Sequence, residues 1–532
     1  MERRDFLKVV GTAAGAGALA SCSNTGGVPP ERMLPYVIGE PEIVPGISTY
    51  YRTTCRECPA GCGMDVRTRE GRALKADGNP LSPISHGKLC ARGQASLHGL
   101  YNPDRVPQAL VRQGGPKDAD PWKKLSWDQA EQQLADALAR GRGRAVFLTQ
   151  NYTGTLDRLV TDWCAALGVE RVIYDTFAWE PVRTANRLLF GVDGVPVHDF
   201  AQAEVVLNFG ADFLETWISP VDYAHGFVQG NAYRAGKRGK LYALSAHQTL
   251  TDLNAEEWVP VKPGTEPLVA LAIARLVAER AGGAGAGAAA PLLAGVNVDA
   301  AAAAAGISPE KIRQIAQDFG NGGRSLAVGP GPAAQHRNAT AVAAAVAILN
   351  SVAGNYGHTL SFARLEEHAG RSASYAQMQQ LLGRLRSGQV QVLLVDGPNP
   401  LYAFPAQDDV AGALAKVPFI ASFSSYLDET SERAHLLLPD HHFLESWGDY
   451  VPRTGVRSIV QPVMMPVFDT KLKGDVLLSV ATRAKATLPN AAPTFYDYLR
   501  GSWQREVQPA AGGAGRLRRE PDTAGVPVVP LL

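Results

Sequence analysis

Residues 55–62 read Cys55-Arg-Glu-Cys58-Pro-Ala-Gly-Cys62, and after 27 intervening residues the sequence continues with Cys90-Ala-Arg-Gly93. Three cysteines on one short loop can face three corners of an iron–sulfur cube. A fourth from a distant loop completes the four thiolates that a [4Fe-4S] cluster requires. A zinc site usually pairs two short two-cysteine loops, and disulfides would crowd the first loop, so both alternatives stay open but fit the spacing less well. The spacing therefore predicts a [4Fe-4S] cluster bound by all four cysteines.

The residues that follow the first cysteine loop alternate as in a small hairpin domain. Residues 64–68 alternate like a strand, turn at Glu70-Gly71, and return through residues 73–76 to a second turn at 77–80. Glycines near the motif let the backbone approach a cluster closely; they are Gly61, Gly63, Gly87 and Gly93. We therefore expect a small domain of short β-hairpins over residues 49–110.

The bulk composition excludes some classes of function. The chain has 532 residues, of which 45% are hydrophobic and 19% charged, which is typical of a globular protein with several buried cores. Its 52 basic and 51 acidic residues leave a net charge of +1. Such a balance provides no basic field for nucleic acid, so no nucleic-acid partner is expected. The longest apolar run, at the N-terminus, is too short and Gly-rich for a membrane span.

The N-terminus has the pattern of an export address. Arg3-Arg4-Asp-Phe-Leu-Lys8 precedes a weakly hydrophobic Ala/Gly stretch, as in a twin-arginine signal. The following Leu19-Ala-Ser-Cys22 resembles a bacterial lipobox with Cys22 as the lipidated residue, although a plain cleavage site stays open. A single lipid anchor holds weakly, so partner subunits are expected to complete membrane attachment. We expect a signal and flexible start over 1–27, an extension over 28–48, and a periplasmic or other extracytoplasmic location.

The body of the chain alternates strand-like and helical patterns, which favours α/β domains with parallel sheets over residues 111–480. Ser126 is a plausible cap for an amphipathic helix that begins at Trp127. Buried strands are predicted at residues 144–148, 205–210, 391–397 and 419–422. We expect a central insertion over 151–355 that contains a low-complexity Ala/Gly stretch at 281–306. Residues 481–532 are predicted to form a tail that is partly disordered from residue 508 onward.

These motifs, taken in order, resemble the molybdopterin oxidoreductase (DMSO reductase) superfamily. The resemblance rests on the cysteine motif with the Gly-Lys-Leu-Cys-Ala-Arg-Gly stretch at 87–93 and on later segments at 210–217, 254–266, 349–357, 396–400 and 430–448. It implies that Arg92 lies between the cluster and a pterin. It also implies a molybdenum or tungsten ion on a bis-molybdopterin guanine dinucleotide. The implied pterin-site remnants are Gly210, Asp212, Pro263, Gly264, Thr265, Glu266 and Asn399.

The sequence departs from this superfamily where a metal ligand should lie. The stretch Tyr174–Arg187 contains no cysteine or serine, and its only carboxylates are Asp175 and Glu180. With Glu180-Pro181 it resembles the molybdopterin-like iron-sulfur subunit of alternative complex III, which implies the fold without molybdenum. That family commonly carries further cysteine clusters that are missing from this sequence. The resemblance therefore implies a separate ferredoxin-like multi-cluster subunit and a membrane quinone-reactive subunit as partners.

A second departure concerns the C-terminal region. Superfamily members end in a β-barrel-like domain that covers the pterin, whereas nothing after Ala486 has the alternating strands for it. The C-terminal β-barrel domain is therefore expected to be absent. Without it, half of a bis-pterin site would be open to water.

Four other residues are candidates for metal ligands on residue type alone. Cys164 lies in an apolar helical pattern and is interpreted as a core residue. His435 is placed in a buried strand, whereas His441 and His442 fall in a loop, and no metal site is assigned to them.

The sequence leaves three functional hypotheses. The first is an iron-sulfur subunit of an exported, membrane-associated oxidoreductase complex that transfers electrons through the cluster. The second is a catalytic molybdenum or tungsten oxidoreductase of the polysulfide, thiosulfate or arsenate type. The third is a non-redox assembly protein with a structural metal site. The missing metal ligand and the missing C-terminal domain favour the first, and leave catalysis by this chain alone in doubt.

Overall fold

The computed structural model divides the chain into two units, Met1–Ile47 and Ser48–Leu532, and the second contains all the helices and strands described. The export-signal residues Arg3 and Arg4, the lipobox Cys22, and the end of the predicted tail lie outside the described residues. The structure describes residue 44 and residues 46–510, apart from 114–120, 178, 234–235, 237, 281–286, 321–323 and 332–335.

The predicted hairpin domain is a three-stranded antiparallel sheet in the order β1-β2-β3. Its strands are β1 (Thr49–Thr54), β2 (Gly63–Arg69) and β3 (Arg72–Gly78), and two short helices follow, α2 (Ala91–Gln94) and α3 (Ser96–Leu100). Met64, Val66 and Ala76 on the inner face are fully buried in one core with Cys55 and Cys62. The inner face of the sheet thus supports the cysteine loop.

The first α/β domain is built on a seven-stranded sheet in the order β5-β4-β16-β15-β14-β6-β7. Strands β6, β7, β14, β15 and β16 are parallel, and β4 and β5 extend the sheet antiparallel. The strands are β4 (Leu110–Arg112), β5 (Trp122–Lys124), β6 (Ala145–Thr149), β7 (Val169–Ile173), β14 (Val392–Asp396), β15 (Phe419–Ser422) and β16 (Leu436–Leu437).

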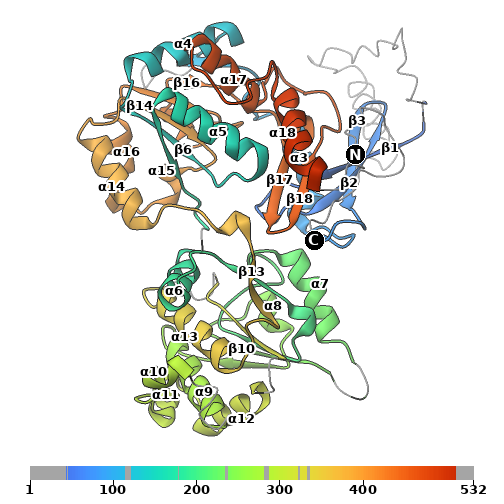
Figure 1. Cartoon of the computed structure of the whole chain (residues 1–532), viewed down its shortest axis with the longest axis vertical. Helices are drawn as coiled ribbons and strands as arrows, with labels where there is room; N and C mark the ends of the chain where they lie inside the picture. The colour runs from blue at the N-terminus through green and yellow to red at the C-terminus, as the bar shows by residue number, and fades with distance from the viewer. Residues whose placement is uncertain are drawn as a thin grey trace, which may run out of the picture. The chain divides into compact units, whose positions relative to one another are not determined.

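Helices cover both faces of this sheet (Figure 1), as in a doubly wound fold. On one face Phe147 and Leu394 pack against α4 (Trp127–Arg140), α5 (Gly154–Leu167) and α17 (Lys473–Arg483). On the other, Leu148 and Leu393 pack against α14 (Tyr375–Arg386) and α16 (Val410–Leu414). The predicted cap of α4 is confirmed, because the Ser126 hydroxyl accepts a hydrogen bond from the Gln129 amide at 3.3 Å.

The second α/β domain has a four-stranded parallel sheet in the order β11-β10-β9-β12. The strands are β9 (Val205–Asn208), β10 (Lys240–Ser245), β11 (Glu257–Pro260) and β12 (Ser325–Val328). The helices that pack on it are α6 (Glu180–Phe190), α7 (Pro220–Gly230), α9 (Glu266–Arg280), α11 (Val298–Ala305), α12 (Pro309–Phe319) and α13 (Ala339–Val352).

The insertion begins later than the expected residue 151. Helix α5 and strand β7 pack in the first domain, because their apolar faces are buried against β6. The insertion also extends past the expected residue 355, because β13 (Leu360–Leu365) pairs with β8 (Pro196–His198) in a two-stranded ladder. Residues 287–306 of the Ala/Gly-rich stretch include α10 (Ala290–Leu293) and α11, whose Ala302 is fully buried.

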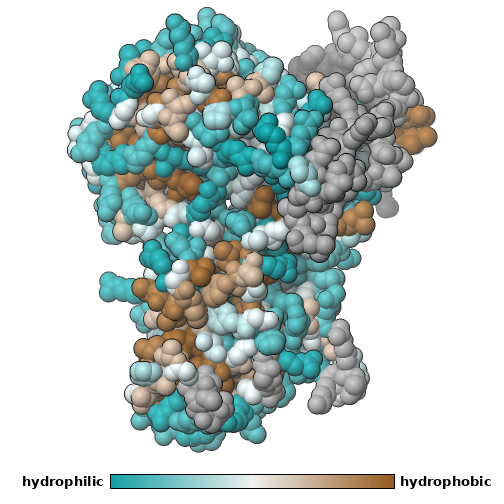
Figure 2. Space-filling view, in the orientation of Figure 1, coloured by the Kyte–Doolittle hydropathy of each residue, from teal (hydrophilic) through white to brown (hydrophobic). Residues whose placement is uncertain are grey.

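Exposed apolar side chains gather on the second domain. Figure 2 shows them over α6 and β13, where the Leu188 side chain is 73% exposed. The rings of Phe190, Tyr356 and Phe362 pack together there, with their centroids 5.0–5.3 Å apart. Among the described residues no single helix is long and apolar enough to cross a membrane. One bent pair, Gly287–Leu293 with Val298–Ala305, meets that test only when taken together.

Two elements near the C-terminal end were not foreseen. The hairpin β17 (Gly448–Arg453) and β18 (Val456–Val460) packs beside β1, and α18 (Phe495–Ala510) packs on the hairpin. The predicted tail therefore begins with an ordered helix, whose Leu499 and Trp503 are buried against Trp447 and Ile459. Between α17 and residue 510, the described part of the chain contains this helix and no strand.

Candidate iron–sulfur centre

The fold brings the four cysteines to one place. Cys55 follows β1 and Cys62 precedes β2, and the Cys55 amide donates to the Cys62 carbonyl at 2.8 Å, which closes the loop between them. Cys90 arrives from the other side and precedes α2 as its N-terminal flanking residue. Cys55 and Cys62 are each 5% exposed, whereas Cys58 and Cys90 are half-buried.

The thiols lie close enough to influence one another's ionisation. Burial, followed by smaller contributions from Cys58 and Cys90, raises the pKa of Cys55 to about 12. Burial and the other three thiols raise the pKa of Cys62 still further. Thiols must lose their protons when they bind iron, so iron binding releases protons from such a site. The clustered thiols therefore fit a cationic iron–sulfur group.

Backbone amides of the loop point at the sulfurs. The Glu57 and Ala60 N–H groups hydrogen-bond the Cys55 and Cys58 thiols and oppose the rise in their pKa caused by burial. Such N–H···S bonds tune the reduction potential of a cluster. Gly61 has φ +68°, and a Cβ there would lie 2.7 Å from the Tyr450 ring. The loop therefore needs glycine both for its conformation and for this close approach.

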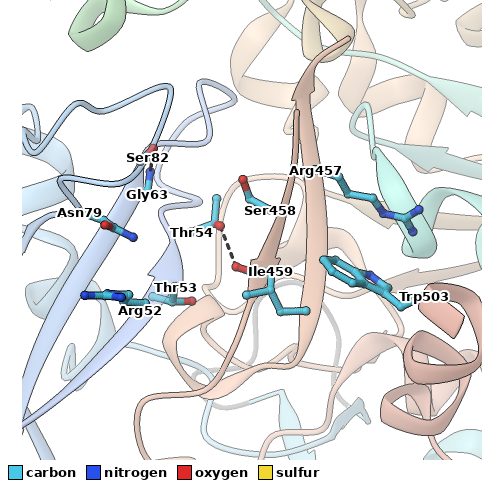
Figure 3. Close-up of a pocket in the computed structure, with 10 residues that line it drawn as sticks. All are labelled: Arg52, Thr53, Thr54, Gly63, Asn79, Ser82, Arg457, Ser458, Ile459 and Trp503. Carbon is cyan, nitrogen blue, oxygen red and sulfur yellow. Dashed lines mark hydrogen bonds between the residues drawn. The ribbon is translucent and has the colours of Figure 1, made fainter. Parts of the chain in front are cut away.

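The hairpin β17–β18 holds the cysteine loop from outside. Tyr450 donates from its hydroxyl to the Pro59 carbonyl at 2.7 Å, and the Arg56 guanidinium lies 3.4 Å above its ring. Thr54 donates to the Ile459 carbonyl at 2.7 Å, as Figure 3 shows. No sequence pattern linked Tyr450 to the cysteines, because the two segments are almost 400 residues apart.

A small pocket of about 40 Å³ lies between the hairpin and the start of β2 (Figure 3). Its residues are Arg52, Thr53, Thr54, Gly63, Asn79, Ser82, Arg457, Ser458, Ile459 and Trp503. The Gly63 amide donates to the Ser82 hydroxyl at 3.2 Å on its wall. The volume suits ordered water and is far below that of an organic cofactor site.

Arg92 lies on the exposed side of α2, and its charge lowers the pKa of Cys58, opposing the larger effect of burial. The arginine is therefore within electrostatic reach of the cluster site. Whether it also faces a pterin stays a prediction.

The predicted pterin-site residues come from both α/β domains. Gly210 and Asp212 follow β9 and are buried, and Asp212 accepts hydrogen bonds from Thr251 at 2.9 Å and from Thr216 at 3.2 Å. Asn399 follows β14, donates to Glu429 and accepts from Thr430, both at 2.7 Å. These polar groups are engaged with protein partners.

The turn Pro263-Gly264-Thr265 leads from β11 to α9, which begins at Glu266. Glu266 is 1% exposed, and one of its carboxylate oxygens has no hydrogen-bond partner among the described residues. The His336 ring lies 3.2 Å from that oxygen. The buried carboxylate of Glu266 therefore faces the His336 ring.

The two carboxylates of the stretch Tyr174–Arg187 each accept a hydrogen bond from a backbone amide. The donor to Asp175 is the Phe177 amide at 3.0 Å, and the donor to Glu180 is the Tyr375 amide at 3.0 Å at the start of α14. Trp179, with φ 53°, precedes α6 and packs its ring edgewise on Trp217. One oxygen of each carboxylate is thus used in a turn or a helix cap.

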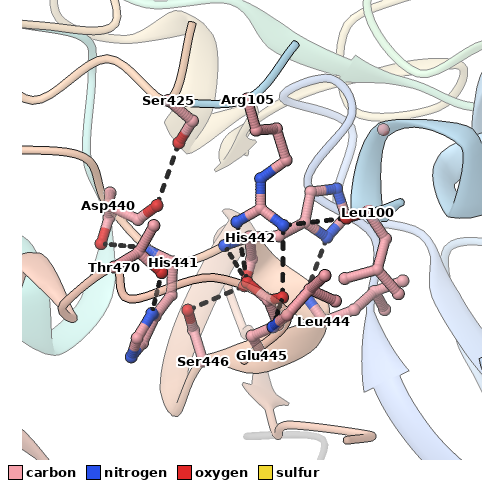
Figure 4. Close-up of polar contacts among 12 residues, drawn as sticks. Leu100, Arg105, Ser425, Asp440, His441, His442, Leu444, Glu445, Ser446 and Thr470 are labelled. Atoms are coloured by element: carbon pink, nitrogen blue, oxygen red, sulfur yellow. Dashed lines mark hydrogen bonds and ion pairs between the residues drawn. The ribbon is translucent and has the colours of Figure 1, made fainter. Parts of the chain in front are cut away.

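The other metal candidates have structural roles. Cys164 is buried in the core of α5. His435 is half-buried and directly precedes β16. Its ring accepts a hydrogen bond from the Ile420 amide of β15 at 3.0 Å. His441 bonds Thr470 at 2.6 Å, and the His442 ring accepts from the Leu444 amide at 3.3 Å (Figure 4).

Among the described residues no group of three or more His, Cys, Asp or Glu side chains is arranged to hold a metal ion. A four-iron cube spreads its ligand sulfurs more widely, because each binds a different iron.

A buried ion pair joins the cysteine domain to the loop before β17. Arg105 and Glu445 have fully buried side chains with Nη2 and Oε2 2.8 Å apart, and Arg105 also donates to the Leu100 carbonyl at 2.9 Å (Figure 4). Glu445 accepts in addition from the amides of His442 at 2.9 Å and Val467 at 2.8 Å. This network fixes α3 against the residues that precede the hairpin.

Known proteins are similar to this chain in sequence or in fold. The menaquinone reductase, molybdopterin-binding-like subunit of Nitratidesulfovibrio vulgaris is 29% identical over 524 residues, 94% of this chain and 74% of that protein. The arsenate respiratory reductase molybdopterin-containing subunit of a Shewanella species is 27% identical over 43% of this chain and 28% of its own length. Acetylene hydratase from Pelobacter acetylenicus has the same fold, with a TM-score of 0.67 and 16% identity over 82% of this chain and 69% of that one.

The family models match the two parts of the fold separately. The molybdopterin oxidoreductase Fe4S4 domain matches residues 48–102, which contain the four cysteines. The molybdopterin oxidoreductase model matches residues 105–483, which span both α/β domains. The chain, with its N-terminal Fe4S4 domain, belongs to the molybdopterin oxidoreductase family.

Proposed function

We propose that this chain is the iron-sulfur subunit of an exported, membrane-associated respiratory complex, and that it transfers electrons through its [4Fe-4S] cluster without a molybdenum centre. The observation that carries the proposal is the meeting of four thiols, two buried and two half-buried, of which three lie on the closed loop and the fourth, Cys90, precedes α2. When bound, the cluster supplies one-electron transfer. The protein's part is to exclude water from Cys55 and Cys62 and to leave Cys58 and Cys90 nearer the surface.

The absence of molybdenum chemistry is supported by the stretch where a metal ligand is expected. Asp175 and Glu180 are committed to backbone amides. At the end of β14 the buried Lys473 pairs with Asp396 and lies 3.1 Å from Asp440. A charged pair therefore occupies the carboxyl end of this strand, where doubly wound folds otherwise receive a ligand.

The partners in this proposal are a ferredoxin-like multi-cluster subunit and a membrane quinone-reactive subunit. The similarity to a menaquinone reductase subunit over 94% of this chain supports a quinone-linked assembly. The likeness of residues 180–187 and 210–217 to the molybdopterin-like subunit of alternative complex III points the same way.

Metal analysis of the purified chain tests this function. We expect a brown protein with about four irons per chain, neither molybdenum nor tungsten, and no pterin fluorescence after acid release. The second hypothesis, a molybdenum or tungsten oxidoreductase, is favoured by the match of residues 105–483 to the molybdopterin oxidoreductase model. Stoichiometric molybdenum or tungsten with pterin would establish it in place of ours, and zinc without iron would contradict both.

The extracytoplasmic location rests on the N-terminal sequence. With both Arg3 and Arg4 replaced by lysine, we expect precursor to accumulate in the cytoplasm, because the twin-arginine pair is what the export pathway reads. Fractionation followed by immunoblotting measures this. The Cys22→Ala variant serves as the comparison, since it should still be exported but should lose its lipid and its direct membrane retention. Normal export of the double-lysine variant would refute the assignment.

A further inference from the structure

The outer face of the three-stranded sheet carries an unusual set of side chains. Strand pairing places Tyr50, Arg67 and Lys75 in one row across β1, β2 and β3. It places Arg69 opposite Arg72 in another row, near the turn between β2 and β3. We call the surface formed by Tyr50, Arg67, Arg69, Arg72, Leu74 and Lys75 the basic face.

Two cross-strand pairs on the basic face join like charges, Arg67 with Lys75 and Arg69 with Arg72. Like charges directly opposite each other destabilise a sheet. The Lys75 ammonium forms an ion pair with the Asp77 carboxylate at 2.8 Å, and the Arg69 guanidinium lies 3.9 Å from the Glu70 carboxylate. Within the described part of the chain, Arg67 and Arg72 have no ion-pair partner. Folding of the sheet therefore gives Arg67 and Arg72 no ion pair that would stabilise it.

Exposed apolar groups lie among these cations. Tyr50 is 62% exposed and Leu74 is 47% exposed. Tyrosine and arginine around an apolar centre are the residues enriched at protein–protein interfaces. The face thus has the composition of a docking surface, and its net positive charge fits an acidic partner.

The basic face lies on the sheet that supports the cluster site. The opposite side of the same strands, including Met64, Val66 and Ala76, shares a core with Cys55 and Cys62. The basic face covers the part of this sheet toward the β2–β3 turn, and the cysteine loop lies at the other end of the strands. At the β3 edge, Lys75 also bonds Gln94 of α2, the helix that follows Cys90 and carries Arg92.

We propose that the basic face is the docking surface for an acidic electron-transfer protein that exchanges electrons with the cluster. This inference rests on the proposed function, because it assumes a redox-active cluster. Opposite charges steer such partners together and make the association rate depend on salt. The unpaired Arg67 and Arg72 would find their counter-charges on the partner.

A reduced plant-type [2Fe-2S] ferredoxin, which is acidic and strongly reducing, serves as the probe. The double variant Arg67→Glu/Arg72→Glu is compared with Arg142→Glu/Arg144→Glu, which reverses two exposed arginines before β6. At low ionic strength we expect the first variant to bind oxidised ferredoxin at least tenfold more weakly. Its cluster should be reduced at least tenfold more slowly, with a flattened salt dependence. The second variant should match the wild type.

The experiment separates the possible failures. Iron content and reduction by dithionite should be unchanged in both variants, and the thermal midpoint of the first should not fall, because its changes relieve like-charge pairs. Unaltered ferredoxin affinity and salt dependence in the first variant would overturn the docking proposal. So would light scattering that shows a dimer of this chain in the wild type and a monomer in that variant. A wild-type chain without iron would refute the proposed function itself.

Discussion

Replacing Cys62 by serine is expected to abolish cluster binding, lowering iron from about four atoms per chain to background. Cys62 is 5% exposed and lies where all three other thiols act on it. A serine hydroxyl stays protonated at neutral pH and is a far weaker ligand for iron than a thiolate. Colorimetric iron analysis and the charge-transfer absorption of the purified chain measure the loss.

The matched control is Cys164→Ser, which makes the same change at a buried cysteine in the core of α5. It should retain all the iron, although it loses some stability, because a hydroxyl is buried in an apolar site. A Cys62→Ser chain with its full iron complement would mean that the ligand set is wrong. Equal iron loss in both variants would show that cluster loss reflects general misfolding.

The second large effect is expected at the buried pair Arg105–Glu445. Changing Glu445 to alanine leaves a buried guanidinium without its partner and should lower the free energy of unfolding by about 3–5 kcal/mol. The double variant Arg105→Met/Glu445→Leu removes both charges and should recover part of that loss, because no uncompensated charge remains. The recovery is incomplete, because the Leu100 carbonyl and the His442 and Val467 amides lose their side-chain partners. Urea unfolding at pH 7 provides the comparison. A single variant as stable as the wild type would contradict the role of the pair.

The same pair makes stability depend on pH. Burial alone would raise the Glu445 pKa, but hydrogen bonds from Arg105 and from the Val467 amide outweigh it and hold the pKa below the ordinary value of 4.5. A lowered folded-state pKa means that the stabilisation is complete above 4.5 and is lost as the pH falls through the lower folded value. In the Glu445→Gln variant this acid-dependent component should disappear, which unfolding curves measured between pH 6 and pH 3 would reveal.

Local patterns predicted much of the fold. The hairpin turn at Glu70-Gly71, the cap at Ser126 and the buried strands β6, β9, β14 and β15 all depend on neighbours in sequence, and the structure confirms each. Cysteine spacing likewise identified the cluster domain, because four thiolates on one cube impose their own pattern.

The support of the cluster site could not be predicted in this way. Tyr450 and the β17–β18 hairpin meet the cysteine loop only in the folded chain. The same is true of Asp449, a fully buried carboxylate that binds Thr155, Arg457 and Trp503 and so ties the hairpin to α5 and α18. A lone aspartate or tyrosine is not part of any periodic pattern, and its structural role depends on contacts with residues hundreds of positions away.

The reach of these contacts sets the order in which the protein can mature. Thr53, two residues before the first cysteine, hydrogen-bonds the Gln461 carbonyl 408 positions later. The cysteine loop therefore leaves the ribosome about 400 residues before its outer wall is synthesised. Domains generally fold in order from the N-terminus as they emerge, but this one must wait for the β17–β18 hairpin. Iron insertion into a finished site therefore cannot precede the synthesis of that hairpin.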